Sequence, residues 1–129
     1  MSIELTMLAW AIALGLVQLL LTGALVTRQR GVKWNAGNRD APVPPASGVA
    51  ARMERATRNF METFPFFAAA ALAVIATQRG SDDTALGAQM YVWARLVYVP
   101  VYAIGIPYLR TAVWAVGFWG MFKVLSALF

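Results

Sequence analysis

The sequence predicts an all-α membrane protein, a bundle of four transmembrane helices. Of its 129 residues, 60% are hydrophobic and only 13% are charged, which is too apolar for an ordinary soluble domain. A bilayer core about 30 Å thick needs roughly 20 apolar residues per helix, so this length provides about four spans and no separate soluble domain. We therefore expect residues 1–129 to form a single membrane domain.

The first predicted helix covers about residues 3–27 and is expected to be a permanent span. Glu4 lies where the basic segment of a cleavable signal belongs, and the uncharged stretch that follows is too long for the apolar segment of a signal. Residues 28–48 form the predicted first loop, because glycine, proline, asparagine and serine collect there.

Three further helices are predicted over about residues 49–77, 84–105 and 107–128. The second helix is free of charge only from Thr63 onward, which is short for a span, so it must bury part of its polar first half. A Gly-Ile-Pro sequence separates the third helix from the fourth, because proline is tolerated in the first turn of a helix.

The basic residues predict the orientation in the membrane. Four lysines and arginines lie in the first loop, against Arg79 alone in the second. By the positive-inside rule, the long first loop is cytoplasmic and both chain ends lie on the other side. The formal net charge of +5 could also suggest nucleic acid, but the basic residues flank apolar spans and no nucleic-acid-binding module is visible, so no such partner is predicted.

Cysteine and histidine are both absent from the chain. Their absence excludes a cysteine nucleophile, a histidine general base and the usual soft or imidazole metal sites, so no metal site is predicted. Any chemistry must use arginine, tyrosine, asparagine or glutamate side chains, or a group that a ligand supplies.

Two polar stripes lie within the predicted spans. On a helical wheel, five polar residues of the second helix share one arc of about 120°. Four residues of the third helix, at spacings of three and four, form a stripe that can face this arc across the bundle. The stripes consist of Arg52, Arg55, Arg58, Asn59 and Glu62 on the second helix and of Tyr91, Arg95, Tyr98 and Tyr102 on the third.

Charges at this depth require a partner. Each costs about 2.5 to 3.5 kcal/mol near a helix centre, so Arg58, Glu62 and Arg95 must be paired, hydrated or bound to a ligand. One alternative is that Arg58 and Glu62 form a structural ion pair, which leaves Arg95 and Asn59 unexplained. Arg52 lies nearer the interface and is expected to reach water.

The inventory of side chains suits a small zwitterion with several carboxylates. Glutathione fits it well, because arginine guanidinium groups match its two carboxylates and Glu62 matches its amine. Its thiol also needs a cation or a hydrogen-bond donor nearby, since the thiolate is the reactive form. Arg110, in the first turn of the fourth helix, or Tyr102 can supply that partner.

The stretches RMERATRNFMETFPFFAAAALAV and WARLVYVPVYAIGIPYLRTAVW resemble the MAPEG family, the membrane-associated proteins of eicosanoid and glutathione metabolism. GNRDAPVPP in the first loop extends the resemblance over essentially the whole chain, and its specific part is the RAxRNxxE pattern of the second helix. The chain is most similar to bacterial members, which implies a location in a bacterial inner membrane. The resemblance also implies a homotrimer that binds glutathione between neighbouring subunits, near the cytoplasmic side.

The resemblance implies roles for nine side chains. Arg110 takes the approximate place of the arginine that activates the thiol in leukotriene-forming and prostaglandin-forming members. Thr57 and Tyr98 stand where the prostaglandin synthase has histidines, so prostaglandin isomerisation is not implied. The implied glutathione-binding residues are Arg28, at the end of the first helix, with Arg55, Arg58, Asn59, Glu62, Arg95, Tyr98 and Tyr102.

Three functions follow as hypotheses. The first is a glutathione transferase or peroxidase whose activated thiol attacks a lipophilic electrophile that enters from the bilayer. The second is a non-enzymatic lipid-binding scaffold, a role that the MAPEG family also includes. The third is a small multidrug transporter, a class of similar length that carries its essential glutamate inside the first helix, whereas Glu4 lies at the edge of this one.

Overall fold

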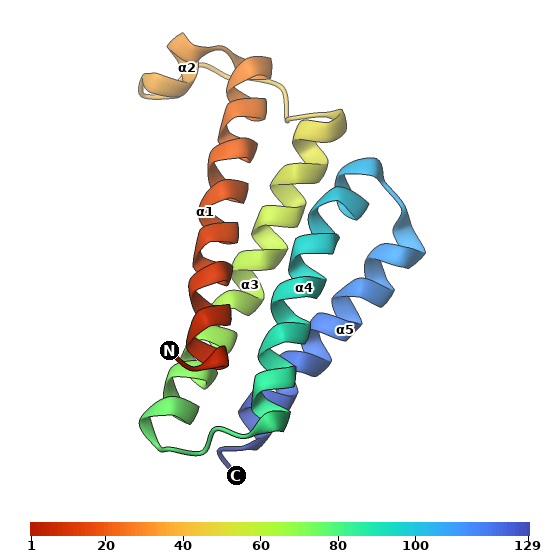
Figure 1. The fold of residues 1–129 in the computed structure, drawn as a ribbon. Helices are drawn as coiled ribbons and strands as arrows, with labels where there is room; N and C mark the ends of the chain where they lie inside the picture. Colours follow the sequence, from red (N-terminus) through yellow and green to blue (C-terminus); the bar gives the residue numbers. More distant parts are fainter.

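The computed structural model describes residues 1–129 and contains five helices and no strands, which confirms the all-α prediction. Four long helices lie side by side, and one short helix follows the end of the first long helix (Figure 1). In chain order they are α1 (Ile3–Arg30), α2 (Val32–Ala36), α3 (Gly48–Ala76), α4 (Asp82–Ile104) and α5 (Pro107–Ser126).

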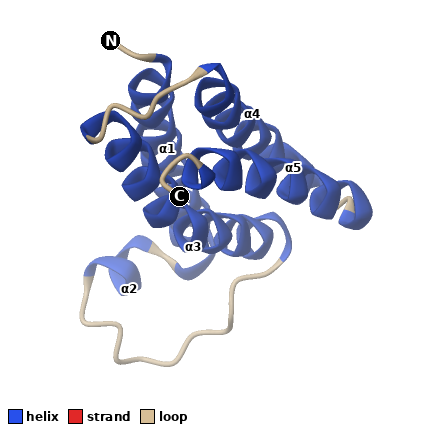
Figure 2. Cartoon of the chain, turned by 90° about the horizontal axis from the view of Figure 1, so that it is seen from below, coloured by secondary structure: helices blue, strands red, loops and turns tan.

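Both chain ends and the turn between α3 and α4 lie at one end of the structure, whereas α2 and the turn between α4 and α5 lie at the other (Figure 1). We call the latter the α2 end. α1 contacts α3 and α4 but not α5. α5 packs against α4, but its two ends differ. Towards the α2 end, α5 diverges from the other helices (Figure 2). The first turn of α5 therefore lies away from α1, and most of its residues are exposed.

The short helix α2 differs from the predicted irregular loop. Gly31, with a positive φ of 94°, ends α1 three residues later than expected, and Gly37 ends α2. The turn-forming residues thus flank the sequence VKWNA and do not interrupt it, so its backbone can close helical hydrogen bonds such as Gly37 N–H to Lys33 C=O.

Two of the helices, α1 and α3, are long and apolar enough to cross a membrane. The other two long helices are shorter, with 23 residues in α4 and 20 in α5. α4 includes Arg95 and a glutamine, and α5 has Arg110 and Lys123 near its two ends. α1 and α3 thus have the length and composition that the predicted membrane spans require.

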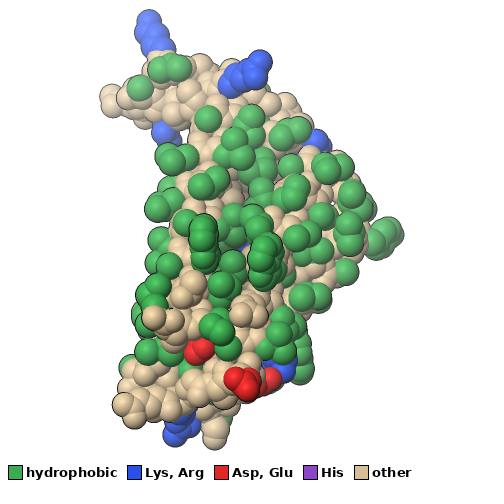
Figure 3. All heavy atoms as spheres, viewed as in Figure 1, with side chains coloured by type: hydrophobic (Ala, Val, Ile, Leu, Met, Phe, Trp, Pro, Cys, Tyr) green, Lys and Arg blue, Asp and Glu red, His purple; other side chains and the backbone are tan.

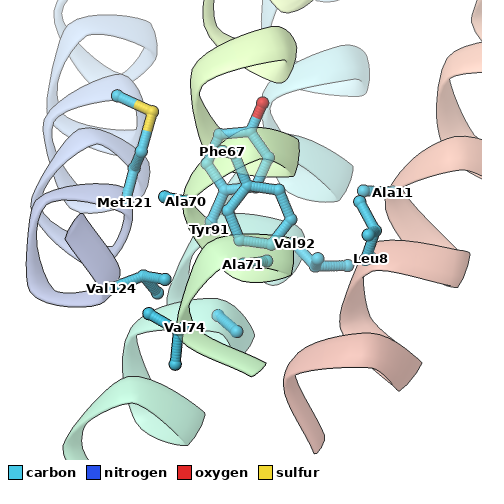
Figure 4. Packing of buried hydrophobic residues seen from close by; sticks show 11 residues of the cluster. Leu8, Ala11, Phe67, Ala70, Ala71, Val74, Tyr91, Val92, Met121 and Val124 are labelled. Carbon is cyan, nitrogen blue, oxygen red and sulfur yellow. The ribbon is translucent and has the colours of Figure 1, made fainter. Parts of the chain in front are cut away.

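The hydrophobic core lies nearer the chain ends than the α2 end. Phe67 of α3 stacks on Tyr91 of α4 with ring centroids 4.2 Å apart, and residues of α1 and α5 close around them (Figure 4). The Tyr91 hydroxyl lies 2.8 Å from the Thr63 hydroxyl, so its polar end is satisfied inside the protein. Tyr91 is therefore a packing residue.

Backbone contact between two glycines holds α4 against α5. A Cβ atom added to Gly120 would lie 2.5 Å from the carbonyl oxygen of Gly87 and 2.9 Å from the backbone nitrogen of Tyr91. We expect Gly120→Ala to push the helices apart and to lower the free energy of unfolding by about 1 to 3 kcal/mol, measured by denaturation in detergent. Gly23→Ala is the matched control, because a Cβ there meets nothing within 4 Å, and it should be neutral or stabilising. Equal effects of the two substitutions would contradict the close α4–α5 contact.

A buried amide between the helices has no partner. Gln18 of α1 is 1% exposed, and neither its Nε2 nor its Oε1 atom forms a hydrogen bond. One turn later, Thr22 does find partners on α3, the Thr57 hydroxyl at 2.7 Å and the Met53 carbonyl at 3.3 Å. An unpaired buried amide costs about 1 to 3 kcal/mol, so Gln18→Met should raise the free energy of unfolding by a similar amount. A loss of stability in the same measurement would show that the amide has a partner in the native protein.

Candidate functional site

The candidate site lies near the α2 end, where α3, α4 and the first turn of α5 come together around Tyr102. The Nε atom of Arg55 donates a hydrogen bond to the Tyr102 hydroxyl oxygen at 3.0 Å. The guanidinium carbon of Arg110 lies 4.8 Å from the centroid of the same ring, and that of Arg55 lies 5.7 Å away. Tyr102 therefore joins arginines from two different helices, and these two cations have no acidic partner in the chain.

The Tyr102 hydroxyl can still donate a hydrogen bond. Because arginine can only donate, the hydroxyl oxygen accepts from Arg55, and its own hydrogen remains free. A hydroxyl that accepts from a cation is also a stronger donor. Tyr102 and Arg110 thus offer a hydrogen bond and a positive charge to the same region.

A second group of contacts lies beside the first. Arg95 of α4 is 2% exposed, and its Nη1 atom donates to the Asn59 Oδ1 atom at 2.8 Å. Its guanidinium carbon lies 4.2 Å from the centroid of the Tyr98 ring, and Tyr98 packs edge-on against Tyr102 with centroids 5.5 Å apart. The tyrosine rings therefore connect Arg95 and Asn59 to the Tyr102 group.

Arg95 determines how the Asn59 amide is oriented. The amide oxygen must face Arg95, because the guanidinium group has no acceptor, so the NH₂ group of Asn59 points elsewhere. The Nε and Nη2 atoms of Arg95 are themselves buried without a hydrogen-bond partner. This guanidinium group is almost fully covered, so within the chain its effect on the surface of the cluster is to orient the Asn59 amide.

Arg52 has a role that the sequence does not reveal. We expected it to reach water, but its Nε atom donates to the Ala103 carbonyl oxygen at 2.8 Å. This carbonyl is one of the last in α4, where backbone acceptors lack helical partners and a cation is favourable. The Arg52 side chain also lies against Gly105, which ends α4 with a φ of 90°. Arg52 therefore holds the end of α4 that carries Tyr102.

Arg58 and Glu62 lie on the same helix but outside these contacts. Both are exposed, and neither forms a hydrogen bond or ion pair within the chain. The ion-pair alternative is therefore wrong for this structure, in which Lys123 and Asp83, at the opposite end, form the one ion pair. The expected meeting of Arg58 and Glu62 with the tyrosines of α4 does not occur either, because their edge of the polar arc points away from α4.

Arg28 also remains apart from the cluster. It lies in the last turn of α1, is exposed and has no polar partner in the chain. Because α1 does not contact α5, a single chain does not bring Arg28 to Arg110. Seven of the nine predicted side chains thus belong to α3 or α4, and five of those seven join Arg110 in one set of direct contacts. Arg55 and Arg110 both contact Tyr102, Tyr102 packs on Tyr98, and Arg95 contacts Tyr98 and Asn59.

An apolar groove lies between α3 and α5, on the chain-end side of the site. Phe66, one turn beyond Glu62, and Ala69 line it together with α5 residues such as Phe118 and Phe122. All nine lining residues are apolar, and the groove has a volume of about 440 Å³. The cationic, donor-rich region and the apolar groove therefore lie on the same two helices, with the groove farther along each of them.

The donor set suits an organic anion better than a metal ion. No group of three histidine, cysteine, aspartate or glutamate side chains is close enough to hold a metal. The free groups are the arginine guanidinium groups, the Asn59 NH₂ and the Tyr102 hydroxyl, which all donate, with Glu62 as the acidic exception. Such a set can bind carboxylates and a thiolate while pairing one amine.

Comparisons with known proteins identify the family. A comparison with curated proteins gives no match. The sequence profile described as the MAPEG family matches residues 7–129, which is nearly the whole chain. This family is membrane-associated and glutathione-related, in agreement with the resemblance of the second-helix pattern and with the apolar helices α1 and α3. The chain belongs to the MAPEG family.

Proposed function

We propose that this protein is a glutathione-dependent membrane enzyme, a microsomal-type glutathione transferase or peroxidase that acts on a lipophilic electrophile. The observation that carries the proposal is that Arg55 and Arg110 both contact Tyr102, whose hydroxyl accepts from Arg55 and keeps its own hydrogen to donate. Family membership supports the choice of glutathione as the thiol.

The residues present fit glutathione in charge and in donor type. Glutathione supplies two carboxylates, an amine and the nucleophilic thiol. Arg55, Arg58 and the Asn59 NH₂ group offer donors to the carboxylates, and exposed Glu62 offers an acceptor to the amine. Arg58 and Glu62 gain the partners that they lack within the chain.

Arg110 and Tyr102 stabilise the thiolate in this proposal. A positive charge and a hydrogen-bond donor lower the pKa of a thiol, because both favour its charged form. Arg110 lies in the first turn of α5, where the helix dipole adds further positive potential. In this proposal a lipophilic electrophile enters from the bilayer, and the apolar groove farther along α3 and α5 offers it a binding surface.

The proposal includes a homotrimer of four-helix subunits. Arg58 and Glu62 are charged, exposed and unpaired on α3, and Phe66 beyond them is 68% exposed. A lipid environment does not suit such charges, whereas a neighbouring subunit or a ligand at its boundary does. Arg28 of one subunit then reaches the site of the next, which explains its separation from the cluster within one chain. Native mass spectrometry should give the mass of three chains.

In the membrane, the proposed orientation places α2 and the site on the cytoplasmic side of a bacterial inner membrane, where glutathione and the basic loop residues both belong. All four long helices cross the bilayer in this arrangement. Cysteines introduced at Lys33 in α2 and at Gln78 in the turn between α3 and α4 should react with an impermeant reagent from opposite sides of the membrane.

Activity of the purified protein tests the proposal. With glutathione and a lipophilic electrophile or hydroperoxide, the wild type should form the conjugate or consume the peroxide well above the rate without protein. The lipid-binding scaffold is the second candidate, favoured by the wholly apolar groove. A scaffold would bind lipid and leave glutathione unchanged, and this result with a range of electrophiles and peroxides would exclude the enzyme.

A further inference from the structure

The segment where α1 ends and α2 begins carries basic side chains that are not part of the proposed enzyme site. We call this segment, with Arg30, Lys33, Trp34 and Arg39, the corner. Basic side chains project from the α2 end, while acidic ones lie near the opposite end on the face shown in Figure 3. Arg30, Lys33 and Arg39 form no ion pair, although Asp40 lies in the same segment. The charge of this corner is thus not neutralised within the chain.

The corner is an ordered structure. Gln29 closes the base of the segment by two hydrogen bonds to Ser47, from its Nε2 atom to the carbonyl at 2.9 Å and from the Ser47 N–H to its Oε1 atom at 3.0 Å. The Trp34 indole N–H donates to the Ala41 carbonyl at 2.6 Å, and Asn35 donates to the Thr27 hydroxyl at 2.8 Å. These bonds fix the Trp34 ring relative to the end of α1.

Trp34 in turn holds two arginines. The guanidinium carbon of Arg30 lies 5.5 Å from the centroid of the indole ring, and that of Arg39 lies 5.7 Å from it. The backbone carbonyl of Asn35 also accepts from the Arg39 Nε atom at 3.1 Å, whereas the Arg30 Nε atom is buried without any partner. Two like charges are therefore kept close together, and their unused donors can bind an anion.

We infer that this corner, Arg30, Trp34 and Arg39 with Lys33, binds the phosphate headgroup of an anionic phospholipid. The position fits a lipid, because α1 can span the membrane and the corner lies where that span ends. Leu16, Leu19 and Leu20 of α1 are 56%, 59% and 73% exposed, so acyl chains can lie along the helix below the headgroup. Guanidinium groups that are already held lose little freedom on binding a phosphate.

Thermal unfolding of the full chain in an uncharged detergent tests this inference. Phosphatidylglycerol should raise the unfolding midpoint by several degrees more than phosphatidylcholine with the same acyl chains, while inorganic phosphate should have no such effect. In Arg30→Gln/Arg39→Gln, affinity for phosphatidylglycerol should fall by about 10-fold or more. Native mass spectrometry of retained lipid gives a second readout.

Two further variants separate a built site from a general charge effect. Arg79→Gln/Lys123→Gln removes the same charge from the opposite end and should keep the preference for phosphatidylglycerol. Trp34→Leu keeps every charge of the corner but releases its arginines, and should lose most of the preference. Arg39→Gln alone, an exposed position, provides a variant that is expected to fold and to weaken binding.

Four results would overturn the inference. They are equal stabilisation by the two lipids, an unchanged preference in the folded Arg39→Gln or Trp34→Leu protein, an equal loss in the variant at the opposite end, and full stabilisation by phosphate alone. None of these results depends on glutathione, so they leave the proposed enzyme function untouched.

Discussion

Arg110→Ala is expected to lower the rate of glutathione conjugation by roughly 10²- to 10³-fold, the effect of removing one preorganised group that stabilises developing or reactive negative charge. Arg110 lies in the open first turn of α5 and contacts the ring of Tyr102, so its removal should leave the thermal stability almost unchanged. Initial rates with a lipophilic electrophile, measured against pH, check both points, because loss of the cation should also move the thiol ionisation to higher pH.

Tyr102→Phe is the matched comparison for Arg110→Ala. It keeps the ring that both arginines contact and removes only the hydroxyl that accepts from Arg55. We expect it to lower the rate by about 10-fold or less, since Arg110 remains, and Arg110→Lys should recover part of the alanine variant's loss. A normal rate for Arg110→Ala together with a collapsed rate for Tyr102→Phe would assign thiol activation to Tyr102.

Arg95→Met is expected to lower glutathione affinity without lowering the free energy of unfolding. The buried guanidinium group has one hydrogen bond and two unpaired nitrogens, so an apolar side chain of similar length should leave the free energy of unfolding unchanged or raise it by about 1 to 4 kcal/mol. Glutathione affinity should nevertheless fall by about 10- to 100-fold, because the Asn59 amide is no longer oriented. Denaturation in detergent and equilibrium glutathione binding measure the two effects.

Asn59→Ala is the control for Arg95→Met. It should lower glutathione affinity to a similar extent without the gain in stability, because Arg95 then loses its hydrogen bond. If Arg95→Met unfolded more easily and bound glutathione normally, Arg95 would be a structural residue with no positioning role.

The helices themselves could be predicted because their signals are local and strong. An uncharged stretch of bilayer length predicts α1, and the Gly-Ile-Pro sequence predicts the sharp turn after α4. The helix α2 was missed because glycines on either side of VKWNA dominate the composition of the loop. Pro65 and Pro100 lie inside α3 and α4 without ending them, since the surrounding apolar residues keep these segments packed as helices.

The candidate site could be predicted as a set of stripes but not as a set of contacts. Helical spacing alone placed Arg55 and Asn59 on one face and Arg95 and Tyr102 on another, and the structure joins these faces. The helical wheel did not show which edge of the arc faces α4. It therefore could not predict that Asn59 contacts α4 whereas Arg58 does not.

The contacts of two further polar residues, Gln18 and Arg52, were not predicted. Gln18 is one turn before Thr22 on the buried side of α1, and this spacing of two polar residues in an apolar span was the available signal. The capping role of Arg52 had no signal, because it depends on where the last turn of another helix lies. Such contacts between distant segments are set by packing and not by local sequence.

Glutathione-dependent thermal stabilisation in detergent tests the central claim, that the α3–α4–α5 cluster binds glutathione, most directly. For the wild type we predict an increase equivalent to about 2.7 kcal/mol at a glutathione concentration 100 times the Kd. Asn59→Ala should lose this increase, while Arg110→Ala should retain most of it, because Arg110 acts on the thiol. No stabilisation of the wild type at saturating glutathione, or full stabilisation of Asn59→Ala, would contradict the claim.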